Sequence, residues 1–272
     1  MDMVIKKNVE LSVIIVNYNG VSFFENCFES LKENLSGIPF EIIVIDNNSK
    51  DESCTMLKEC YPEVKLIESK ENLGFGKGNN LGVKYAKGKT ILLLNNDTIL
   101  QSHLLPAIQT LYSKLENGIV SINMLNANKE YVPAVGRFPS PFRLFKISFL
   151  MDSRVEFKTG KFRSNHYDVD WVTGAFMLIR KADYEAINGF DLDYFMYVED
   201  VDLCKKMKDI GKKCIFISNL NYIHFVGFNK SRENLLLKGY EIYAFKHFSR
   251  VGHKIAKLML ALNKFVKRNS GE

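Results

Sequence analysis

Short apolar runs alternate with segments of helical spacing through the first 100 residues of the chain. The apolar runs are rich in β-branched residues and are too short for helices. Continuous apolar strands separated by helices are typical of a mostly parallel sheet covered on both faces. We therefore expect an α/β fold, with strands at residues 11–16, 41–45, 64–68 and 90–94 and helices at residues 23–35 and 74–85.

Each of these four expected strands ends in polar residues. The ends lie at residues 17–19, 46–48, 68–72 and 95–97. In open parallel sheets, ligands bind beyond the carboxyl ends of the strands. The pattern therefore predicts a ligand site where these polar segments meet, and a nucleotide is the expected occupant.

The second half of the chain is less regular. Residues 138–157 begin with prolines and predict a long loop or mobile segment. We expect a strand with a glycine kink at residues 171–179, a helix at 199–210 that stops at Gly211, and short strands at 214–217 and 221–225. No repeat or linker divides the chain. We expect one domain over residues 1–240, with a nucleotide-binding half at about 1–125 and an acceptor and catalytic half at about 126–240, followed by a helical tail at 241–272.

Composition and charge narrow the class of protein. The chain is 46% hydrophobic and 25% charged, which is ordinary for a globular protein, and no apolar run approaches the roughly 20 residues of a membrane-spanning helix. No signal peptide is visible, and the five cysteines lack a C-x-x-C spacing. They are typical of reduced buried thiols in a cytosolic protein. The net charge of +6 lies in the tail, because residues 242–271 carry seven Lys or Arg and no acid. A balanced body argues against nucleic acid as a partner.

Two acidic segments are candidates for chemistry. Asp97 follows Asn95 and Asn96 at the end of a buried strand, where a carboxylate can hold a hard divalent cation. The alternative is an ordinary turn, since Asn and Asp are common turn residues. Glu199 and Asp200 begin an expected helix after aromatic residues that can bury them and raise a pKa, as a general base requires. The alternative there is a helix N-terminus that favours acids.

A histidine and a glycine-rich segment are weaker candidates for a ligand site. His224, at the end of an expected strand, is a candidate metal ligand, although a lone histidine is more often structural. The glycine-rich segment at residues 74–78 lacks the Gly-Lys-Ser/Thr ending of a P-loop and the G-x-G-x-x-G spacing of a dinucleotide fingerprint. It also follows the third strand, whereas that fingerprint follows the first. A Rossmann dehydrogenase is therefore disfavoured.

Seven sequence blocks in order resemble family 2 glycosyltransferases of the GT-A fold, especially the bacterial rhamnosyltransferase-like group. The resemblance extends over about residues 11–230. The blocks are VIIVNYNG at 13–20, EIIVIDNNSKD at 41–51, ENLGFGKGNN at 71–80, LLLNNDT at 92–98, WVTGAFMLIR at 171–180, GFDLDYFMYVEDVDLC at 189–204 and IHFVG at 223–227.

The resemblance implies roles for individual residues. Asp200 matches the catalytic base, with Glu199 as the competing candidate, and Asp97 matches the metal-binding acid of an Asp-x-Asp motif whose earlier positions are here Asn95 and Asn96. His224 matches a histidine that completes the metal shell. The residues implied in contacts with the nucleotide or donor sugar are Asn17, Tyr18, Asn19, Asp46, Asn72, Gly76, Asn79, Asn95, Asn96, Gly174 and Ala175.

The same resemblance implies an inverting transfer from a nucleotide-diphosphate sugar, with Mg²⁺ or Mn²⁺ on the leaving diphosphate. The expected donor is dTDP-rhamnose, followed by UDP-sugars. The expected acceptor is a saccharide or lipid-linked acceptor in cell-surface polysaccharide synthesis, bound by residues 138–157. A nucleotide-sugar-binding protein without turnover is an alternative that would not need the acid pair. A sugar nucleotidyltransferase is another, but residues 17–20 lack the Lys or Arg expected after its first strand.

The tail predicts an amphipathic helix at residues 254–268. Its apolar face would carry Ile255, Leu258, Met259, Leu262, Phe265 and Val266, and its polar face Lys254, Lys257, Lys264, Lys267 and Arg268. Such a helix can lie on an anionic membrane surface, which would make the protein peripheral on the cytoplasmic face. The alternative is that the apolar face packs on the protein's own body or on a second subunit.

Overall fold

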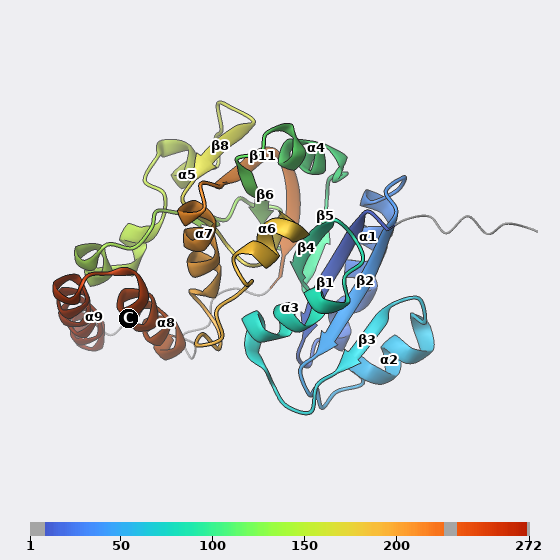
Figure 1. Ribbon diagram of the computed structural model, residues 1–272, viewed down its shortest axis with the longest axis horizontal. Helices are drawn as coiled ribbons and strands as arrows, with labels where there is room; N and C mark the ends of the chain where they lie inside the picture. Colours follow the sequence, from blue (N-terminus) through green and yellow to red (C-terminus); the bar gives the residue numbers. More distant parts are fainter. Residues whose placement is uncertain (1–8, 226–232, 271–272) are drawn as a thin grey trace, which may run out of the picture.

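A mixed nine-stranded sheet forms the centre of the computed structural model, which describes residues 9–225 and 233–270 (Figure 1). The strand order along it is β3-β2-β1-β4-β10-β6-β11-β5, and β8 pairs with β11. The strands are β1 Leu11–Asn17, β2 Phe40–Asp46, β3 Lys65–Glu68, β4 Thr90–Asn95, β5 Thr98–Leu100, β6 Asn117–Leu125, β8 His166–Val169, β10 Phe176–Arg180 and β11 Lys213–His224; β7 Val135–Gly136 and β9 Trp171–Val172 form a separate two-stranded ribbon.

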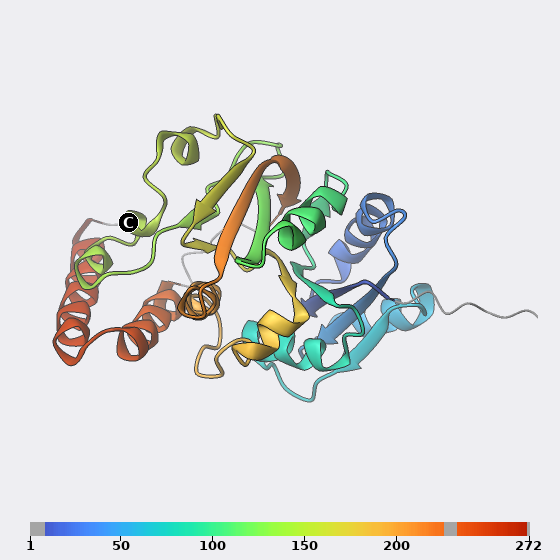
Figure 2. The same cartoon turned by 45° about the horizontal axis from the view of Figure 1, so that its top comes forward.

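The helices cover both faces of this sheet and extend beyond it at the C-terminal end (Figures 1 and 2). The α-helices are α1 Phe24–Asn34, α2 Ser53–Cys60, α3 Gly74–Tyr85, α4 Leu105–Ser113, α5 Val155–Thr159, α6 Lys181–Ala186, α7 Glu199–Asp209, α8 Glu233–His247 and α9 Arg250–Ser270, and the 3₁₀ helices are η1 Val21–Phe23, η2 Pro141–Phe145 and η3 Ile147–Leu150.

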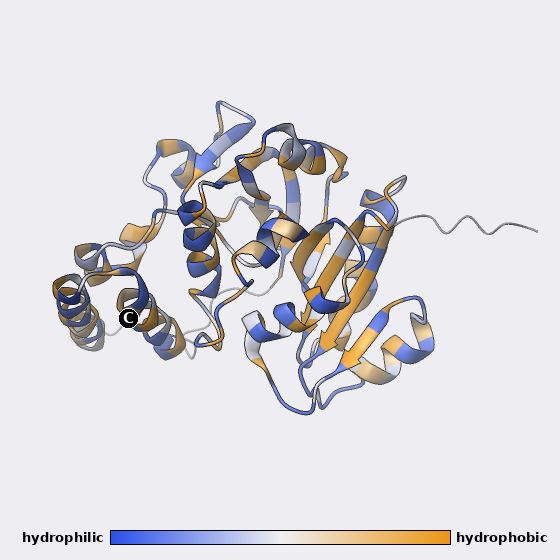
Figure 3. Cartoon of the chain, in the orientation of Figure 1, coloured by the Kyte–Doolittle hydropathy of each residue, from blue (hydrophilic) through white to orange (hydrophobic). Residues whose placement is uncertain are grey.

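The expected α/β fold with a mostly parallel sheet is confirmed. Strands β1, β2, β3 and β4 are mutually parallel, whereas β10 runs antiparallel to β4 and β6. Alternate residues of β1 enter two different cores. Val13 and Ile15 pack with Phe24 and Phe28 of α1, whereas Ile14 packs on the opposite face with Val83 of α3. Burial on both faces explains why these strands are apolar throughout their length (Figure 3).

Three expectations for the second half were wrong in detail. The expected strand at 171–179 is two strands, β9 and β10, which belong to different sheets. The expected loop at 138–157 contains η2, η3 and the start of α5, and Leu144, Leu150 and Phe157 are fully buried in it. The expected strands at 214–217 and 221–225 are one strand, β11, with a register shift between Ile217 and Asn221. Long-range packing, which local patterns do not encode, causes each difference.

The cysteines and the C-terminal tail also differ in part from what the sequence predicts. Cys60 is exposed and Cys54 half-buried, so burial was correctly expected only for the other three cysteines, and all five are free. The expected boundary at residues 240 and 241 falls inside α8, and the expected helix at 254–268 lies within α9. No helix among the described residues is long and apolar enough to cross a bilayer.

Candidate active site at the carboxyl ends of the strands

A hydrogen-bonded network joins the ends of β1, β2 and β4. The Asn17 amide donates to Asp46 Oδ1 at 2.9 Å and accepts from Asn96 Nδ2 at 2.7 Å. Asp46 Oδ2 accepts the backbone N–H of Ser49 at 2.9 Å. Asn17 and Asp46 are neighbours because the parallel register pairs them at the ends of their strands. The predicted nucleoside residues Asn17 and Asp46 therefore lie together, with Asn96 beside them.

The loop after β1 places an aromatic side chain at the mouth of this network. Tyr18 is 53% exposed, and an exposed aromatic ring offers a surface on which a nucleobase can stack. Asn19 has a left-handed backbone with φ 53°, and its N–H donates to Ser49 Oγ at 2.9 Å. At Gly20 an added Cβ would lie 2.0 Å from Asn96 Nδ2 and 2.7 Å from Asn17 Oδ1, so a larger residue would displace these two amides. The sequence reading missed Ser49, although it stands in the same polar segment as Asp46.

The glycine-rich segment at the start of α3 packs against the loop before α7. Asn72 Oδ1 accepts the N–H of Gly74 at 2.9 Å, which orders the turn into the helix. An added Cβ at Gly76 would lie 2.9 Å from Phe190 Cβ. The Asn79 side chain is 1% exposed, and its amide donates to the Phe75 carbonyl at 3.0 Å. Asn79 thus points into the protein, and its contact with a donor stays a prediction.

Asp97 and His224 form the candidate metal site. His224 Nε2 lies 3.2 Å from Asp97 Oδ1 and 3.2 Å from Asn95 Nδ2, because β11 reaches the end of β4 through β5. Two ligands in neighbouring positions of an octahedral Mg²⁺ shell, each at about 2.1 Å, lie about 3.0 Å apart. The observed separation therefore fits a shared cation. The described residues contain no group of three or more His, Cys, Asp or Glu that would hold a metal unaided.

The acid pair at the start of α7 is held by backbone groups and by burial. Asp200 Oδ2 accepts the N–H of Gly174 at 2.9 Å, and Oδ1 accepts the N–H of Val201 at 2.8 Å. Burial raises the pKa of Asp200, and these two N–H groups oppose that effect. Burial, followed by the negative charge of Asp200, raises the pKa of Glu199 well above its usual value. Glu199 is 5% exposed, and its Oε2 has no hydrogen-bond partner among the described residues.

Backbone strain immediately precedes this pair. Tyr197 and Val198 both have left-handed backbones, with φ 69° and φ 72°. For a β-branched residue such as Val198 this conformation costs roughly 1–3 kcal/mol, and such outliers cluster at functional sites. After this turn Glu199 is buried and Asp200 is the half-buried member of the pair.

Gly174 and Ala175 connect the acid pair to the end of β4. The Ala175 carbonyl accepts the N–H of Asn95 at 3.1 Å, while Gly174 donates to Asp200. An added Cβ at Gly174 would lie 3.0 Å from the Phe75 ring, which leaves little room for a side chain. The predicted site residues at β1, β2, β4 and α7 are therefore brought to one edge of the sheet.

Two supporting residues were missed by the sequence reading. Asn80 Oδ1 accepts the N–H of Phe190 at 2.9 Å, and Asn80 Nδ2 donates to the Phe190 carbonyl at 2.8 Å, which fastens α3 to the loop before α7. His247 Nε2 lies 2.6 Å from Asp202 Oδ1, so α8 is tied to α7. In the sequence, only the pair of asparagines at 79 and 80 indicated the contact between Asn80 and Phe190. No local pattern indicated the contact between His247 and Asp202.

Sequence comparisons find similar proteins among the glycosyltransferases. A family model described as "Glycosyl transferase family 2" matches residues 12–187. "Rhamnosyltransferase WbbL" of Escherichia coli is 31% identical over 227 residues, which cover 78% of this chain and 82% of the relative. "N-acetylglucosaminyl-diphospho-decaprenol L-rhamnosyltransferase" of Mycobacterium tuberculosis is 21% identical over 241 residues, which cover 82% of this chain and 78% of the relative.

Solved structures support the fold. The mannosyltransferase PcManGT from Pyrobaculum calidifontis, in complex with GDP-Man and Mn²⁺, aligns with a TM-score of 0.63 at 16% identity, covering 98% of this chain and 76% of that one. S. aureus TarS in complex with UDP aligns with a TM-score of 0.60 at 19% identity, covering 97% of this chain and 72% of that one. Both show that the chain shares its fold with proteins that bind a nucleotide or nucleotide sugar.

Proposed function

Because the chain belongs to glycosyl transferase family 2 and is therefore a glycosyltransferase, we propose that it moves a sugar from a nucleotide-diphosphate sugar to an acceptor hydroxyl with inversion at the anomeric carbon. One observation carries the mechanism. Asn95 contacts His224 through its side chain and the Ala175 carbonyl through its N–H, and the neighbouring Gly174 donates to Asp200. A short stretch of backbone thus links the candidate metal residues to the candidate base.

Asp200 is the catalytic base in this proposal. Its carboxylate accepts the proton of the acceptor hydroxyl, which then attacks the anomeric carbon from the face opposite the nucleotide. The two N–H donors fix the carboxylate and leave lone pairs for that proton. Glu199 is the competing candidate, but its deeper burial favours a neutral, positioning role.

The donor would lie across the strand ends. Asn17, Asn19 and Asp46 surround the nucleoside position and Tyr18 offers its ring, while Asp97 and His224 would hold Mg²⁺ or Mn²⁺. Such a cation, when bound, stabilises the charge that develops on the leaving diphosphate. Both metals accept the carboxylate oxygen of Asp97, whereas the imidazole nitrogen of His224 suits Mn²⁺ better than Mg²⁺, because Mg²⁺ is the harder cation.

The names of the relatives support a rhamnosyl donor and a role in cell-surface polysaccharide synthesis. Two are rhamnosyltransferases, and one of these acts on a diphospho-decaprenol. We propose dTDP-rhamnose as the first donor to test, then UDP-sugars, and a saccharide or lipid-linked acceptor. A binding protein without turnover would not need the acid pair or the strained backbone before it.

Peripheral membrane contact is a further part of the proposal. Leu258, Leu262 and Phe265 on α9 remain 57%, 38% and 63% exposed, while the same helix packs on the body through Ala256 and Leu260. Packing on the body therefore covers the face of α9 with Ala256 and Leu260, and it leaves the apolar face with Leu258, Leu262 and Phe265 exposed. Exposed lysines at 254, 257 and 264 lie on α9 as well, and their charge suits an anionic lipid surface. Lys267 and Arg268, which were expected on the same polar face, have side chains outside the described part of the chain.

A donor screen tests the proposed function. The purified chain is heated with dTDP-rhamnose, UDP-glucose, UDP-GlcNAc or GDP-mannose, with Mn²⁺ present, and its melting temperature is compared with that of the chain with Mn²⁺ alone. A ligand at 100 times its Kd stabilises the native state by about 2.7 kcal/mol. We expect dTDP-rhamnose to give the largest increase. If none of these nucleotide sugars raises the melting temperature, the proposed function is wrong.

A further inference from the structure

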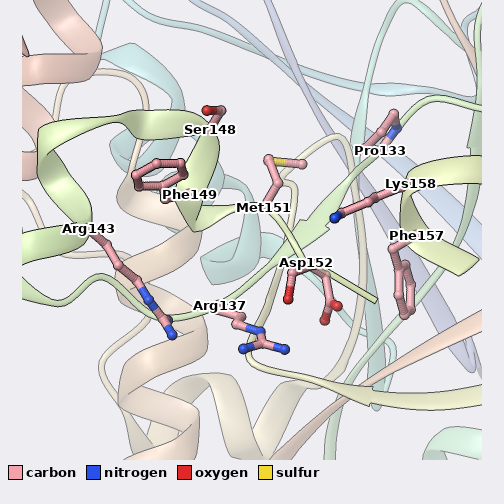
Figure 4. A pocket seen from close by; sticks show the side chains of 10 residues that line it. Pro133, Arg137, Arg143, Ser148, Phe149, Met151, Asp152, Phe157 and Lys158 are labelled. Atoms are coloured by element: carbon pink, nitrogen blue, oxygen red, sulfur yellow. The ribbon is translucent and has the colours of Figure 1, made fainter. Parts of the chain in front are cut away.

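A cavity lies between the η2–η3 segment and α5, and the residues that line it are different from those of the candidate active site (Figure 4). Its volume is about 580 Å³. A neighbouring cavity of about 430 Å³ shares Arg137, Arg143 and Asp152 with it, so the two arginines stand where the cavities meet. Lys158 lines the first cavity, and Figure 4 shows all three cationic side chains directed into this region.

The three cations are available to a ligand. Arg137 and Arg143 are half-buried, and neither guanidinium makes a hydrogen bond or a salt bridge with any part of the chain that the structure describes. The same holds for the Lys158 ammonium. Half-buried guanidinium groups lose hydration, and a fork of N–H donors is best satisfied by a carboxylate or a phosphate.

The acids nearby are already occupied. Asp152 accepts from Arg154 Nε at 3.1 Å and from Arg154 Nη2 at 2.8 Å. Burial works to raise the pKa of Asp152, but the hydrogen bonds from Arg154 outweigh it and hold that pKa below its usual value. In the second cavity, Asp168 lies 3.3 Å from Lys213 and Asp170 accepts the N–H of Phe138 at 2.9 Å. The charge of Arg137 also lowers the pKa of Asp152, so Arg137 shares this acid with Arg154. Among the described residues, Arg143 and Lys158 form no salt bridge, so their charges remain for a ligand.

Part of the cavity lining is apolar. Pro133, Phe149, Met151 and Phe157 line it together with the cations, and Phe149 is 56% exposed. Two guanidinium groups and an ammonium exceed what a single carboxylate needs, but they match the several oxygens of a phosphate or diphosphate. An inorganic anion would leave the apolar side chains of the cavity in contact with water. The lining therefore fits a phosphate or diphosphate ester whose organic part covers these side chains.

The β7–β9 ribbon connects this cavity to the candidate base. Trp171 Nε1 donates to the Arg137 carbonyl at 2.9 Å at one end, and the Thr173 N–H donates to the Ala134 carbonyl at 2.9 Å at the other. The next residue, Gly174, donates to Asp200. Trp171 and Gly174 are three residues apart in the chain, so their Cα atoms lie at most about 11 Å apart. A short saccharide can bridge such a distance.

We propose that the Arg137–Arg143–Lys158 pocket binds the phosphate or diphosphate ester end of the acceptor while its reacting hydroxyl lies at Asp200. This inference rests on the proposed function, because it assumes that an acceptor hydroxyl reaches Asp200. It adds the residues that recognise the phosphate-bearing end of such an acceptor.

Binding of farnesyl diphosphate by the full chain tests the proposal, measured by calorimetry without added metal. Inorganic diphosphate and farnesol are the comparison probes, since each carries one half of the recognised chemistry. The variants are Arg137→Gln and Arg143→Gln. Arg163→Gln is the matched control, because the Arg163 side chain is 88% exposed in the same half of the chain and lies 3.9 Å from Glu156. Asp97→Ala reports on binding at the strand ends instead.

We expect each arginine variant to weaken farnesyl diphosphate binding by about tenfold or more, since each removes charge-assisted hydrogen bonds. Arg163→Gln and Asp97→Ala should bind it as the wild type does, and both comparison probes should bind more weakly. Thermal melts should show that the arginine variants fold, because neither side chain makes a hydrogen bond or a salt bridge with the described residues that the substitution would remove. Wild-type affinity in both arginine variants would overturn the proposal. Loss of binding in Asp97→Ala, or inorganic diphosphate binding as tightly as the ester, would overturn it too.

The donor screen separates this inference from the proposed function. If nucleotide sugars stabilise the arginine variants as they do the wild type, the donor site is intact, and loss of farnesyl diphosphate concerns the pocket alone. If nucleotide sugars stabilise neither the wild type nor the variants, the proposed function fails whatever the pocket binds.

Discussion

Replacing Asp200 by Asn tests the base directly, because Asn has nearly the same size but cannot take a proton. General base catalysis contributes about 10²–10⁴-fold, so we expect the turnover number of Asp200→Asn to fall by that range. The donor contacts proposed at Asn17, Asp46 and Asp97 do not involve residue 200. Donor affinity should therefore change little, and the loss should appear in kcat and not in the donor KM.

The structure also gives the cost to stability. Asp200 accepts two N–H groups, one on each carboxylate oxygen, whereas Asn has one oxygen and would turn its NH₂ group toward the other donor. Loss of one hydrogen bond to a charged group costs about 1.5–3 kcal/mol. For a chain of this size, each kcal/mol lowers Tm by roughly 2–4 °C. Activity must therefore be compared well below the Tm of the variant.

Glu199→Gln is the matched control. Burial and the charge of Asp200 raise the pKa of Glu199 well above its usual value, so the folded protein keeps the neutral form to higher pH than a free glutamate does, and Gln imitates that form. We expect Glu199→Gln to keep most of its activity. The folded state holds this proton more tightly than the unfolded state does, so wild-type stability should fall as pH rises above about 4.5. Glu199→Gln has no such titrating group, so the difference between its Tm and the Tm of the wild type should shift in favour of the variant as pH increases.

The assay is release of nucleoside diphosphate from the donor, with the acceptor or with water in place of the acceptor hydroxyl. Thermal melts with donor confirm binding in each variant. If Asp200→Asn retains transfer while Glu199→Gln loses it, the roles of the two acids must be exchanged. If both retain it, neither residue is the base and the proposed mechanism is refuted.

Two further predictions concern the metal and the tail. Asp97→Ala should remove the Mn²⁺-dependent part of donor stabilisation and abolish turnover, and near-normal activity across Mn²⁺ and Mg²⁺ concentrations would contradict the metal assignment. The double variant Leu258→Gln, Phe265→Gln should bind anionic vesicles more weakly in co-sedimentation than both the wild type and the control Leu115→Gln, whose side chain is 85% exposed elsewhere. Lys254→Gln and Lys257→Gln should each remove about 1 kcal/mol of salt-sensitive binding. Equal sedimentation of all these proteins would refute the membrane contact.

The first half of the fold could be predicted from the sequence, because each of its strands is buried on both faces and so is a continuous apolar run. The apolar run at 90–94 predicts β4 without reference to any other segment, and the helical spacing at 74–85 gave the bounds of α3 as observed. The polar ends Asn17 and Asp46 were expected to meet because parallel strands share a carboxyl edge, and the register pairs them. Local pattern and global topology agree in this half of the chain.

The rest of the site depends on contacts that no local pattern encodes. Strands β9 and β10 separate because Trp171 packs in the β7–β9 ribbon, while Phe176 enters the large sheet. The cavity with Arg137 and Arg143 arises only when the 138–157 segment folds against α5 and α9, and the prolines in that segment instead indicated a loop. The anchoring of α9 to this segment, by Asn263 Nδ2 donating to the Phe145 carbonyl at 2.7 Å, spans more than 100 residues of chain.

Helix α8 belongs with the catalytic half and not with the tail. An added Cβ at Gly239 of α8 would lie 2.7 Å from the Tyr197 carbonyl, so the helix packs directly against the strained turn that precedes Glu199 and Asp200. His247, from the last turn of α8, lies 2.6 Å from Asp202 Oδ1 in the first turn of α7. A left-handed valine persists only where its surroundings over-determine it, and α8 supplies those surroundings. We therefore place the end of the catalytic half after His247, because a chain that stopped at residue 240 would lose the contact that holds α7 and its acid pair in place.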